Sequence, residues 1–142
     1  MAATAEAASE STPVSRLGFA PGQVVQEIGW DDDVDNDVRF AVEDITRTDL
    51  EDEDYGDVAD AVLVWFRDGE GDLVDLLVDC LTNLADEGFL VLCTPKAGRP
   101  AYVQASDVEE SALTAGLHAA GTANASADWA TVRLVSPKNQ RR

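Results

Sequence analysis

Basic side chains are few in this sequence, and their shortage is uneven along the chain. The 142 residues contain 10 Lys and Arg against 28 Asp and Glu, for a formal net charge of −18. Residues 1–87 hold 24 of the acidic side chains and 4 of the basic ones, whereas residues 88–142 carry a net charge of +2. Such a surface repels phosphate backbones, so we expect no nucleic-acid binding. The acidity either serves solubility alone or also attracts a basic partner or cations.

Histidine and cysteine are also scarce, which limits the available chemistry. The chain has one histidine, His118, and two cysteines that do not form a CxxC motif, so a Cys/His metal site is not expected. Cys80 and Cys93 fall at apolar positions, where we expect buried free thiols. His118 lies in a weakly patterned segment away from the predicted strand ends, so hydrolase-type catalysis is difficult to build.

Long apolar runs are absent as well. No run reaches the ~18 apolar residues of a membrane span, and the N-terminus has neither the basic region nor the apolar segment of a signal peptide. We therefore expect a cytoplasmic protein with no membrane association. Residues 1–15 are small and polar and predict a disordered tail, residues 16–137 predict a single α/β domain, and residues 138–142 form a basic C-terminal tail.

The clearest structural pattern lies between residues 60 and 98. An unbroken apolar run over residues 61–66 has the length and the β-branched and aromatic content of a buried strand. A helical apolar stripe follows from Leu73 to Leu84, and we expect Gly88 to end that helix. A second apolar run over residues 89–93 predicts a parallel neighbour of the first strand, joined to it by a right-handed crossover.

The segments before and after this unit extend it. Residues 23–29 predict a first strand, and apolar residues spaced over 34–45 predict a helix with aspartates in its first turn. Residues 48–56 are strongly acidic and predict a solvent-exposed loop. Ser106 and Glu109 have the spacing of a capping box, which predicts the start of a third helix.

The C-terminal part predicts an antiparallel strand pair. Gly116 is expected to follow the end of the third helix, residues 118–127 predict a weak edge strand, and residues 131–135 predict a clearer one. The complete order is strand, helix, acidic loop, strand, helix, strand, helix and two strands. It predicts an α/β fold with a mainly parallel sheet, an antiparallel C-terminal pair and helices on both faces.

Several segments carry a resemblance to known families. A glycine follows the first strand, DVADAVLVWF forms a central strand, and LADEGFLVLCTP forms a helix-to-strand junction. With the terminal strand pair, this order resembles the class I S-adenosylmethionine-dependent methyltransferases and implies a truncated Rossmann-like sheet over most of residues 17–137. The segments LGFAPGQVVQEIGWDDDVD, EDYGDVADAVLVWFRD and TPKAGR are similar, more specifically, to a family of short acidic actinobacterial proteins of unknown function.

The methyltransferase resemblance implies a cofactor site from which this sequence departs. Such enzymes hold S-adenosylmethionine on a glycine-rich loop after the first strand, where this chain has Gly29 followed by Trp30 and three aspartates. They also bind the ribose with an acidic residue that ends a second strand. Asp60 comes only 31 positions after Gly29, so we expect that strand to be missing or reduced to a stub. We predict no cofactor, with S-adenosylmethionine as the alternative.

The candidate site lies at the carboxyl ends of the predicted parallel strands, where open α/β sheets bind ligands. An aromatic residue, carboxylates and two cations are expected to converge there as a ligand or partner crevice. Its residues are Gly29, Trp30, Asp31, Asp32, Asp33, Arg67, Asp68 and Lys96. Alternatively, the aspartates cap the following helix and the cations neutralise them. No nucleophile–base pair is evident, so no catalytic residue is predicted.

The aspartates have part of the spacing of a calcium loop. Asp31, Asp33 and Asp35 occupy its positions 1, 3 and 5. However, Asn36 stands where the loop requires glycine, and Val42 stands where it requires a bidentate glutamate. We therefore predict no metal site.

Taken together, these features favour a non-enzymatic interaction or regulatory module with a degenerate methyltransferase-like fold. Its acidic segments, Asp31–Asp37 and Asp49–Asp57, would face a basic protein partner. Trp30 and Trp129 lie at strand junctions, where each either anchors a partner or packs over the sheet edge. The alternative is a small-ligand-binding protein, or a methyltransferase, that uses the crevice at the strand ends.

Overall fold

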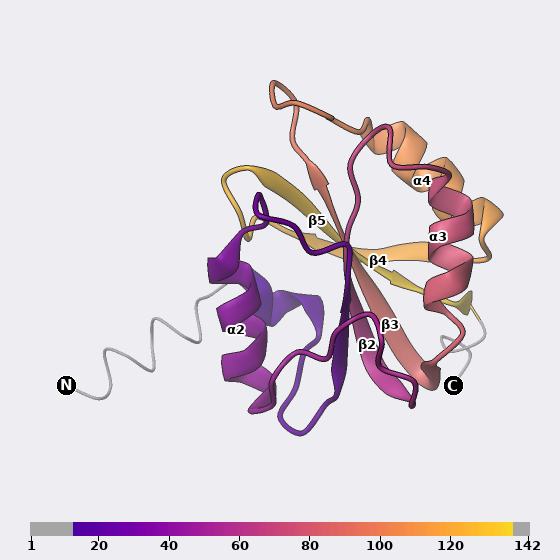
Figure 1. Ribbon diagram of the computed structural model, residues 1–142. Coiled ribbons are helices and arrows are strands. Elements are labelled where there is room, and N and C mark those ends of the chain that lie inside the picture. The colour runs from indigo at the N-terminus through magenta and orange to yellow at the C-terminus, as the bar shows by residue number, and fades with distance from the viewer. Residues whose placement is uncertain (1–12, 138–142) are drawn as a thin grey trace.

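One mixed five-stranded sheet, covered by helices on both faces, forms the body of the protein (Figure 1). The computed structural model describes residues 13–137. The strands are β1 (Val25–Ile28), β2 (Ala59–Trp65), β3 (Leu84–Pro95), β4 (His118–Ala123) and β5 (Trp129–Val135). The helices are η1, a 3-10 helix (Pro13–Leu17), α2 (Asn36–Thr46), α3 (Leu73–Cys80) and α4 (Ala105–Thr114).

The strand order is β1-β2-β3-β5-β4. β1, β2 and β3 are parallel, while β5 is antiparallel to both β3 and β4. In Figure 1, α2 lies on one side of the sheet, and α3 and α4 lie on the other. This arrangement confirms the predicted α/β class, the parallel central strands and the antiparallel C-terminal pair.

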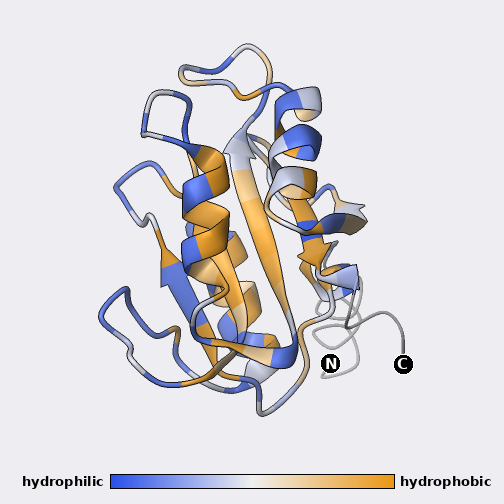
Figure 2. Ribbon diagram, turned by 90° about the vertical axis from the view of Figure 1, so that its right-hand side faces the viewer, coloured by the Kyte–Doolittle hydropathy of each residue, from blue (hydrophilic) through white to orange (hydrophobic). Residues whose placement is uncertain are grey.

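Two apolar cores form because the central strands are buried on both faces. Hydrophobic residues run along the central strands, while polar residues are frequent in the surrounding helices and loops (Figure 2). On the side of α2, strand residues such as Leu63, Trp65 and Val91 pack with the helix. On the side of α3 and α4, Val64 and Leu92 pack with the other helices. Alternate residues of one strand therefore supply both cores.

β1 is less apolar than the other parallel strands because a buried polar cluster replaces part of its core. Glu27 is buried, and its carboxylate accepts hydrogen bonds from Arg39 Nε at 2.7 Å and Trp65 Nε1 at 2.8 Å. The Arg39 bond raises the pKa of that guanidinium. A paired carboxylate can therefore occupy a position where an unpaired one would be costly.

Helix α3 is shorter than predicted. It ends at Cys80, and a turn then leads into β3 at Leu84, whose neighbour Asn83 accepts a hydrogen bond from the amide of Ala59 at 2.8 Å. Leu84 packs against the same core as α3. Its apolar side chain therefore fits the helical spacing of the sequence, although the residue lies in a strand. Gly88 therefore lies inside β3 and does not end the helix, contrary to the sequence prediction.

Helix α4 also begins differently from the prediction. Its N-cap is Gln104, which makes no side-chain capping bond, and Ser106 lies inside the helix, so the predicted capping box is wrong. The predicted C-terminal signal is present. Gly116 has φ of 87°, its amide donates to Leu113 O at 3.0 Å, and the next amide donates to Ala112 O at 2.7 Å. These two bonds form a Schellman motif.

The acidic loop after α2 keeps a remnant of a strand beside β1. Glu51 forms a single parallel bridge with Gln26, through backbone bonds of 2.7 and 2.8 Å to neighbouring β1 residues. The side-chain amide of Gln26 also donates to the carbonyl of Asp52 at 3.2 Å. Within residues 13–137, this bridge is all that continues the sheet beyond β1. The expected second strand is thus reduced to a stub.

The remaining expectations concern the ends of the chain, the thiols and the membrane. Pro13 to Ser15, which were expected to belong to the tail, are part of η1, and Val14 is buried. Residues 1–12 and 138–142 lie outside the described part of the chain. Cys80 and Cys93 are buried free thiols, as predicted. Among the described helices, none is both long and apolar enough to cross a bilayer.

Candidate functional site

Arg67 is the centre of the site at the carboxyl ends of the parallel strands. It lies just beyond β2, and its side chain is only 10% exposed. Its Nε and Nη2 donate to the Asp33 carboxylate at 2.9 and 2.6 Å, its Nη1 donates to the carbonyl of Gly29 at 3.1 Å, and it also pairs with Glu70 at 3.2 Å. The guanidinium therefore ties the end of β1 to the end of β2.

The guanidinium also packs against an aromatic ring. The Cζ atom of Arg67 lies 5.2 Å from the ring centroid of Trp129, within the range of a cation–π contact. Trp129 in turn meets Trp65 edge to face, with centroids 4.9 Å apart, and its Nε1 donates to the carbonyl of Asp33 at 3.2 Å. Trp129 is buried, so packing over the sheet edge is the interpretation that applies to this tryptophan.

Asp33 and Arg67 form a charged pair. The hydrogen bond from Arg67 is the main cause that lowers the pKa of the Asp33 carboxyl, and partial burial opposes it. The same hydrogen bond raises the pKa of Arg67. Both side chains therefore stay ionised at neutral pH, and the positive charge at the strand ends is already neutralised by protein carboxylates.

Gly29 is required by the backbone at the end of β1. Its φ is 86°, and a Cβ atom there would lie 2.2 Å from the carbonyl oxygen of Trp65. Its amide donates to the Glu53 carboxylate at 2.7 Å. The backbone group that a phosphate- or carboxylate-binding loop would offer to a ligand therefore already has an anionic partner.

The first aspartates after β1 do not cap helix α2. Asp35 is the N-cap, and its carboxylate accepts the amide of Asp37 at 2.9 Å. Asp31 and Asp32 are exposed, and the Asp31 carboxylate accepts the Asp32 amide at 2.7 Å. The adjacent Trp30 is 53% exposed, so it does not pack over the sheet edge as Trp129 does.

Lys96 and Asp68 lie apart from the Asp33–Arg67 pair. Lys96 Nζ donates to Asn124 Oδ1 at 3.0 Å and to the carbonyl of Ser126 at 2.7 Å, both in the connection between β4 and β5. The side chain of Asp68 is exposed, while its amide donates to the carbonyl of Ala101 at 3.0 Å. The structure thus brings Gly29, Asp33 and Arg67 together, but it does not direct Lys96 towards the carboxylates.

Sequence reasoning missed some contributors to this site. Glu70 could have been found, because its spacing of three residues from Arg67 suits a local ion pair. Glu53 could not, since it comes from a distant segment whose position depends on the folded sheet. Trp129 was expected at a strand junction, but its contact with Arg67 could not be read from the sequence. His118 lies at the opposite end of the sheet, where it pairs with Val135. Among the described residues, no group of three or more His, Cys, Asp or Glu is placed to hold a metal ion.

Residues 14–138 match the family described as "Protein of unknown function (DUF3052)". The chain belongs to this family. Uncharacterized protein Rv2239c of Mycobacterium tuberculosis (strain ATCC 25618 / H37Rv) is 44% identical over 125 residues, which cover 88% of this chain and 78% of that protein. Uncharacterized protein Mb2263c of Mycobacterium bovis has the same identity and coverage.

Solved structures with the same fold include methyltransferases. The pyocyanin biosynthetic protein PhzM aligns with a TM-score of 0.64 at 13% identity, over 87% of this chain and 53% of PhzM. The ribosomal protein L11 methylase from Lactobacillus delbrueckii subsp. bulgaricus aligns with a TM-score of 0.54 at 12% identity, over 87% of this chain and 74% of the enzyme. The chain thus spans about half the length of PhzM. At these identities, the similarity establishes a methyltransferase-like fold alone.

S-adenosylmethionine, the cofactor that this fold implies, does not fit the residues present. The amide of Gly29 is bonded to Glu53, and Arg67 crosses the strand ends between β1 and β2. The strand that would supply a ribose-binding carboxylate is represented by the single bridge at Glu51. Each element that the family resemblance assigns to cofactor binding is therefore occupied or reduced.

Proposed function

We propose that this protein is a non-enzymatic interaction module that binds a basic protein segment on its acidic face. The observation that carries the proposal is the buried Arg67 across the strand ends, which is paired with Asp33 and Glu70 and bonded to the carbonyl of Gly29. It fills the edge at which open α/β sheets hold their ligands. The fold is then a scaffold, and the surface beside that edge becomes the candidate for function.

The acidic face consists of two exposed segments along the outer side of β1. The Glu51 bridge and the Glu53–Gly29 hydrogen bond hold the second segment next to the first. The exposed carboxylates of the acidic face, taken over both segments, are Asp31, Asp32, Asp33, Asp37, Asp49, Glu51, Asp52, Glu53, Asp54 and Asp57. Because the Glu51 bridge and the Glu53–Gly29 hydrogen bond hold these loops beside β1, the carboxylates present a negative potential that attracts basic partners and accelerates their association.

Trp30 gives this face an apolar centre. It follows Gly29 at the point where the two acidic segments meet, and about half of its surface is exposed. A tryptophan surrounded by carboxylates suits an arginine or lysine side chain, which would stack on the ring while its charge is paired. We therefore infer a partner rich in arginine and lysine.

The proposal is tested by capture from lysate with immobilised protein, followed by affinity measurement with the purified partner. The quadruple variant Asp31→Asn, Asp32→Asn, Glu51→Gln and Asp52→Asn should lose binding, and Trp30→Ala should weaken it roughly tenfold. A matched control removes four exposed carboxylates from α3 and α4 on the other face of the sheet. The control substitutions are Asp75→Asn, Asp79→Asn, Asp107→Asn and Glu110→Gln.

Wild-type binding should weaken steeply between about 50 and 300 mM salt, because exposed charges are screened within ~8–10 Å. Equal losses in the two quadruple variants, or capture that salt does not affect, would contradict the proposed face. A methyltransferase would behave differently in titration calorimetry. Micromolar binding of S-adenosylmethionine or its demethylated product, lost in Asp31→Ala or Lys96→Ala, would refute the non-enzymatic function.

A further inference from the structure

The two edges of the sheet are protected differently. At one edge, the Glu51 bridge and the acidic loop lie along the outer side of β1. At the other edge, β4 pairs with β5 alone among the strands of residues 13–137. Proteins usually guard an edge strand with charged side chains, proline or a covering element, because its free N–H and C=O groups can pair with another strand.

Charged side chains and proline are missing from β4 and from the sequence around it. Residues 111–127 contain no Asp, Glu, Lys, Arg or Pro, although 27% of the whole chain is charged. Alanine and glycine make up most of β4, and its residues 119–122 are exposed. Such small side chains allow the backbone of another strand to approach closely.

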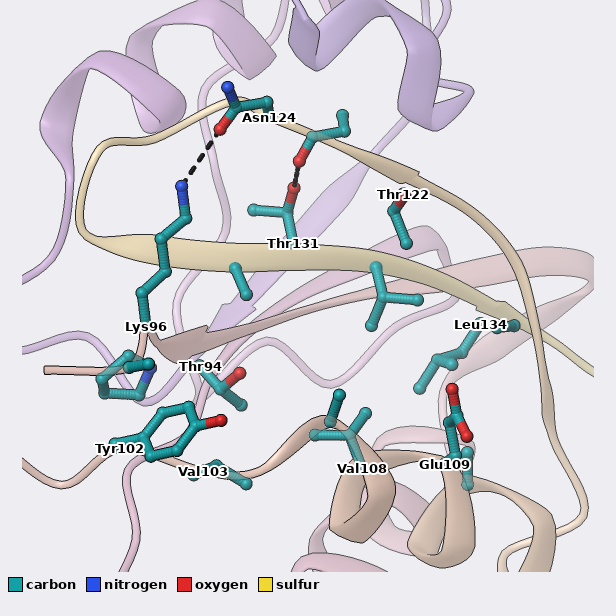
Figure 3. Close-up of a pocket in the computed structure, with 18 of the residues that line it drawn as sticks. Thr94, Lys96, Tyr102, Val103, Val108, Glu109, Thr122, Asn124, Thr131 and Leu134 are labelled. Atoms are coloured by element: carbon teal, nitrogen blue, oxygen red, sulfur yellow. Dashed lines mark hydrogen bonds between the residues drawn. The ribbon is translucent and has the colours of Figure 1, made fainter.

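Helix α4 does not cover this edge either. A groove of about 610 Å³ lies between α4 and the strands β3, β5 and β4. Figure 3 shows Thr122 of β4 across this groove from Val108 and Glu109 of α4. The side of β4 that faces α4 is therefore open up to the edge of the sheet.

The outer backbone groups of β4 have no partner in the described part of the chain. In an antiparallel pair, alternate residues direct their N–H and C=O groups away from the neighbouring strand. Among residues 13–137, no backbone hydrogen bond joins residues 118–123 to an element other than β5. A register shift between Ala119 and Gly121 interrupts the ladder, and the regular part runs from Gly121 to Ala123. A further strand can therefore continue the sheet along this regular part.

The distribution of charge favours a second copy of this chain as that further strand. Residues 88–142, which include β4, carry a net charge of +2, whereas the acidic face lies along β1 at the other edge. In a sheet continued through two β4 strands, the two β1 strands are nine strand spacings apart, or roughly 43 Å. This distance is several times the Debye length of ~8–10 Å, so the two acidic faces do not oppose the contact. A two-fold contact also brings each residue close to its own counterpart, which an uncharged strand tolerates.

We propose that β4 pairs antiparallel with β4 of a second copy of this chain, around a two-fold axis beside Thr122. The contact joins the two five-stranded sheets into one continuous sheet and leaves the acidic faces free at its two ends. It shares no residue with the acidic face, so either proposal can fail without the other.

Sedimentation equilibrium of the full chain over a wide concentration range tests the proposal. Wild type should dimerise with a Kd on the order of 10 μM, because a short strand pair buries less area than the ~1,200 Å² of a stable interface. Raising the salt concentration from about 50 to 300 mM should leave this Kd unchanged or lower it, because salt screens the repulsion between two acidic chains. A monomer at every concentration up to about 500 μM would overturn the proposal. A dimer that salt dissociates would also overturn it, by assigning the contact to charged surfaces.

Thr122→Lys should weaken the dimer at least about tenfold, because it places two like charges roughly 5 Å apart across the axis. Thr122→Glu should do the same. An equimolar mixture of the two variants should dimerise within about fivefold of wild type, which also shows that both variants are folded.

The matched control is Thr114→Lys, which changes another exposed threonine, in α4, and should alter Kd less than about twofold. Equal effects of Thr122→Lys and Thr114→Lys would overturn the proposal. A mixture of the Thr122→Lys and Thr122→Glu variants that stays monomeric would overturn it as well.

Discussion

Replacing Arg67 with methionine should destabilise the fold by about 2–3 kcal/mol. The change keeps the apolar stem but removes the bidentate bond to Asp33 and the bond to the carbonyl of Gly29. Hydrogen bonds to charged groups contribute about 1.5–3 kcal/mol, and the contact with Trp129 adds about 0.5–1 kcal/mol. The lower end of the hydrogen-bond range applies, because the Asp33 side chain is 48% exposed and water can take the place of Arg67 in the variant.

Urea unfolding followed by tryptophan fluorescence measures this loss, and the melting temperature should fall roughly 5–10 °C. Arg67→Lys should lie between wild type and methionine, because lysine keeps the charge but not the planar pair of donors. The control is Arg99→Met. It makes the same change of charge but breaks a half-exposed pair with Asp128 at 3.1 Å, so it should cost less than about 0.5 kcal/mol. If both methionine variants lose the same stability, the strand ends are not held by Arg67.

Three further outcomes follow from individual contacts. The bond from Arg67 lowers the folded-state pKa of Asp33 below 3.8, so the ionised carboxylate stabilises the fold above that pH, and the contribution disappears as pH falls through the folded value. Asp33→Asn should therefore lower stability by up to about 1 kcal/mol at pH 7, and this difference from wild type should shrink as pH falls below 3.8 and the folded-state carboxyl becomes protonated. Burial raises the pKa of Cys80 to about 12, so at pH 8 only roughly one thiol in 10,000 is ionised, and iodoacetamide should label the native protein far more slowly than the unfolded chain. Gly29→Ala should cost roughly 3 kcal/mol or more in thermal unfolding, because its Cβ would lie 2.2 Å from the Trp65 carbonyl at positive φ.

Each of these predictions has a control in the same chain. Asp31→Asn removes an exposed carboxylate that has no ion pair with Arg67, and it should change stability at pH 7 by less than about 0.5 kcal/mol. Gly56→Ala introduces a methyl group into open space and should change stability by less than about 0.5 kcal/mol. Fast labelling of the cysteines in the native protein would contradict their burial. A stability difference between wild type and Asp33→Asn that does not shrink as pH falls below 3.8 would contradict the Asp33–Arg67 contact. A Gly29→Ala variant as stable as wild type would contradict the close approach to Trp65.

The candidate site was partly predictable because strand ends are readable from sequence. The apolar runs place Gly29 and Arg67 at the carboxyl ends of neighbouring parallel strands, so their proximity follows from topology. The same rule predicts Lys96 at that edge. It fails for the direction of the lysine side chain, because the β4–β5 connection offers Asn124 and a carbonyl nearer to its ammonium group.

The boundary errors have a similar cause. Helical spacing from Leu73 to Leu84 predicts one long helix, but Leu84 reaches the same core from β3. A periodic pattern reports which face is buried and does not state which element carries the residue. The capping-box pattern at Ser106 likewise describes a local possibility, because it would start the helix at Asp107, whereas α4 begins two residues earlier, at Ala105.

By itself, the sequence determined the strand–helix–strand unit, the order of elements, the acidic character and the reduction of the second strand. These features depend on local hydrophobic periodicity and on the number of residues between elements, and both can be read directly from the sequence. Only the tertiary structure decided that Arg67 is neutralised by Asp33, that Glu53 bonds to Gly29, and that a groove lies between α4 and the strands β3, β5 and β4. Side-chain partners and cavities arise from segments far apart in sequence, so their geometry exists only once the sheet is assembled.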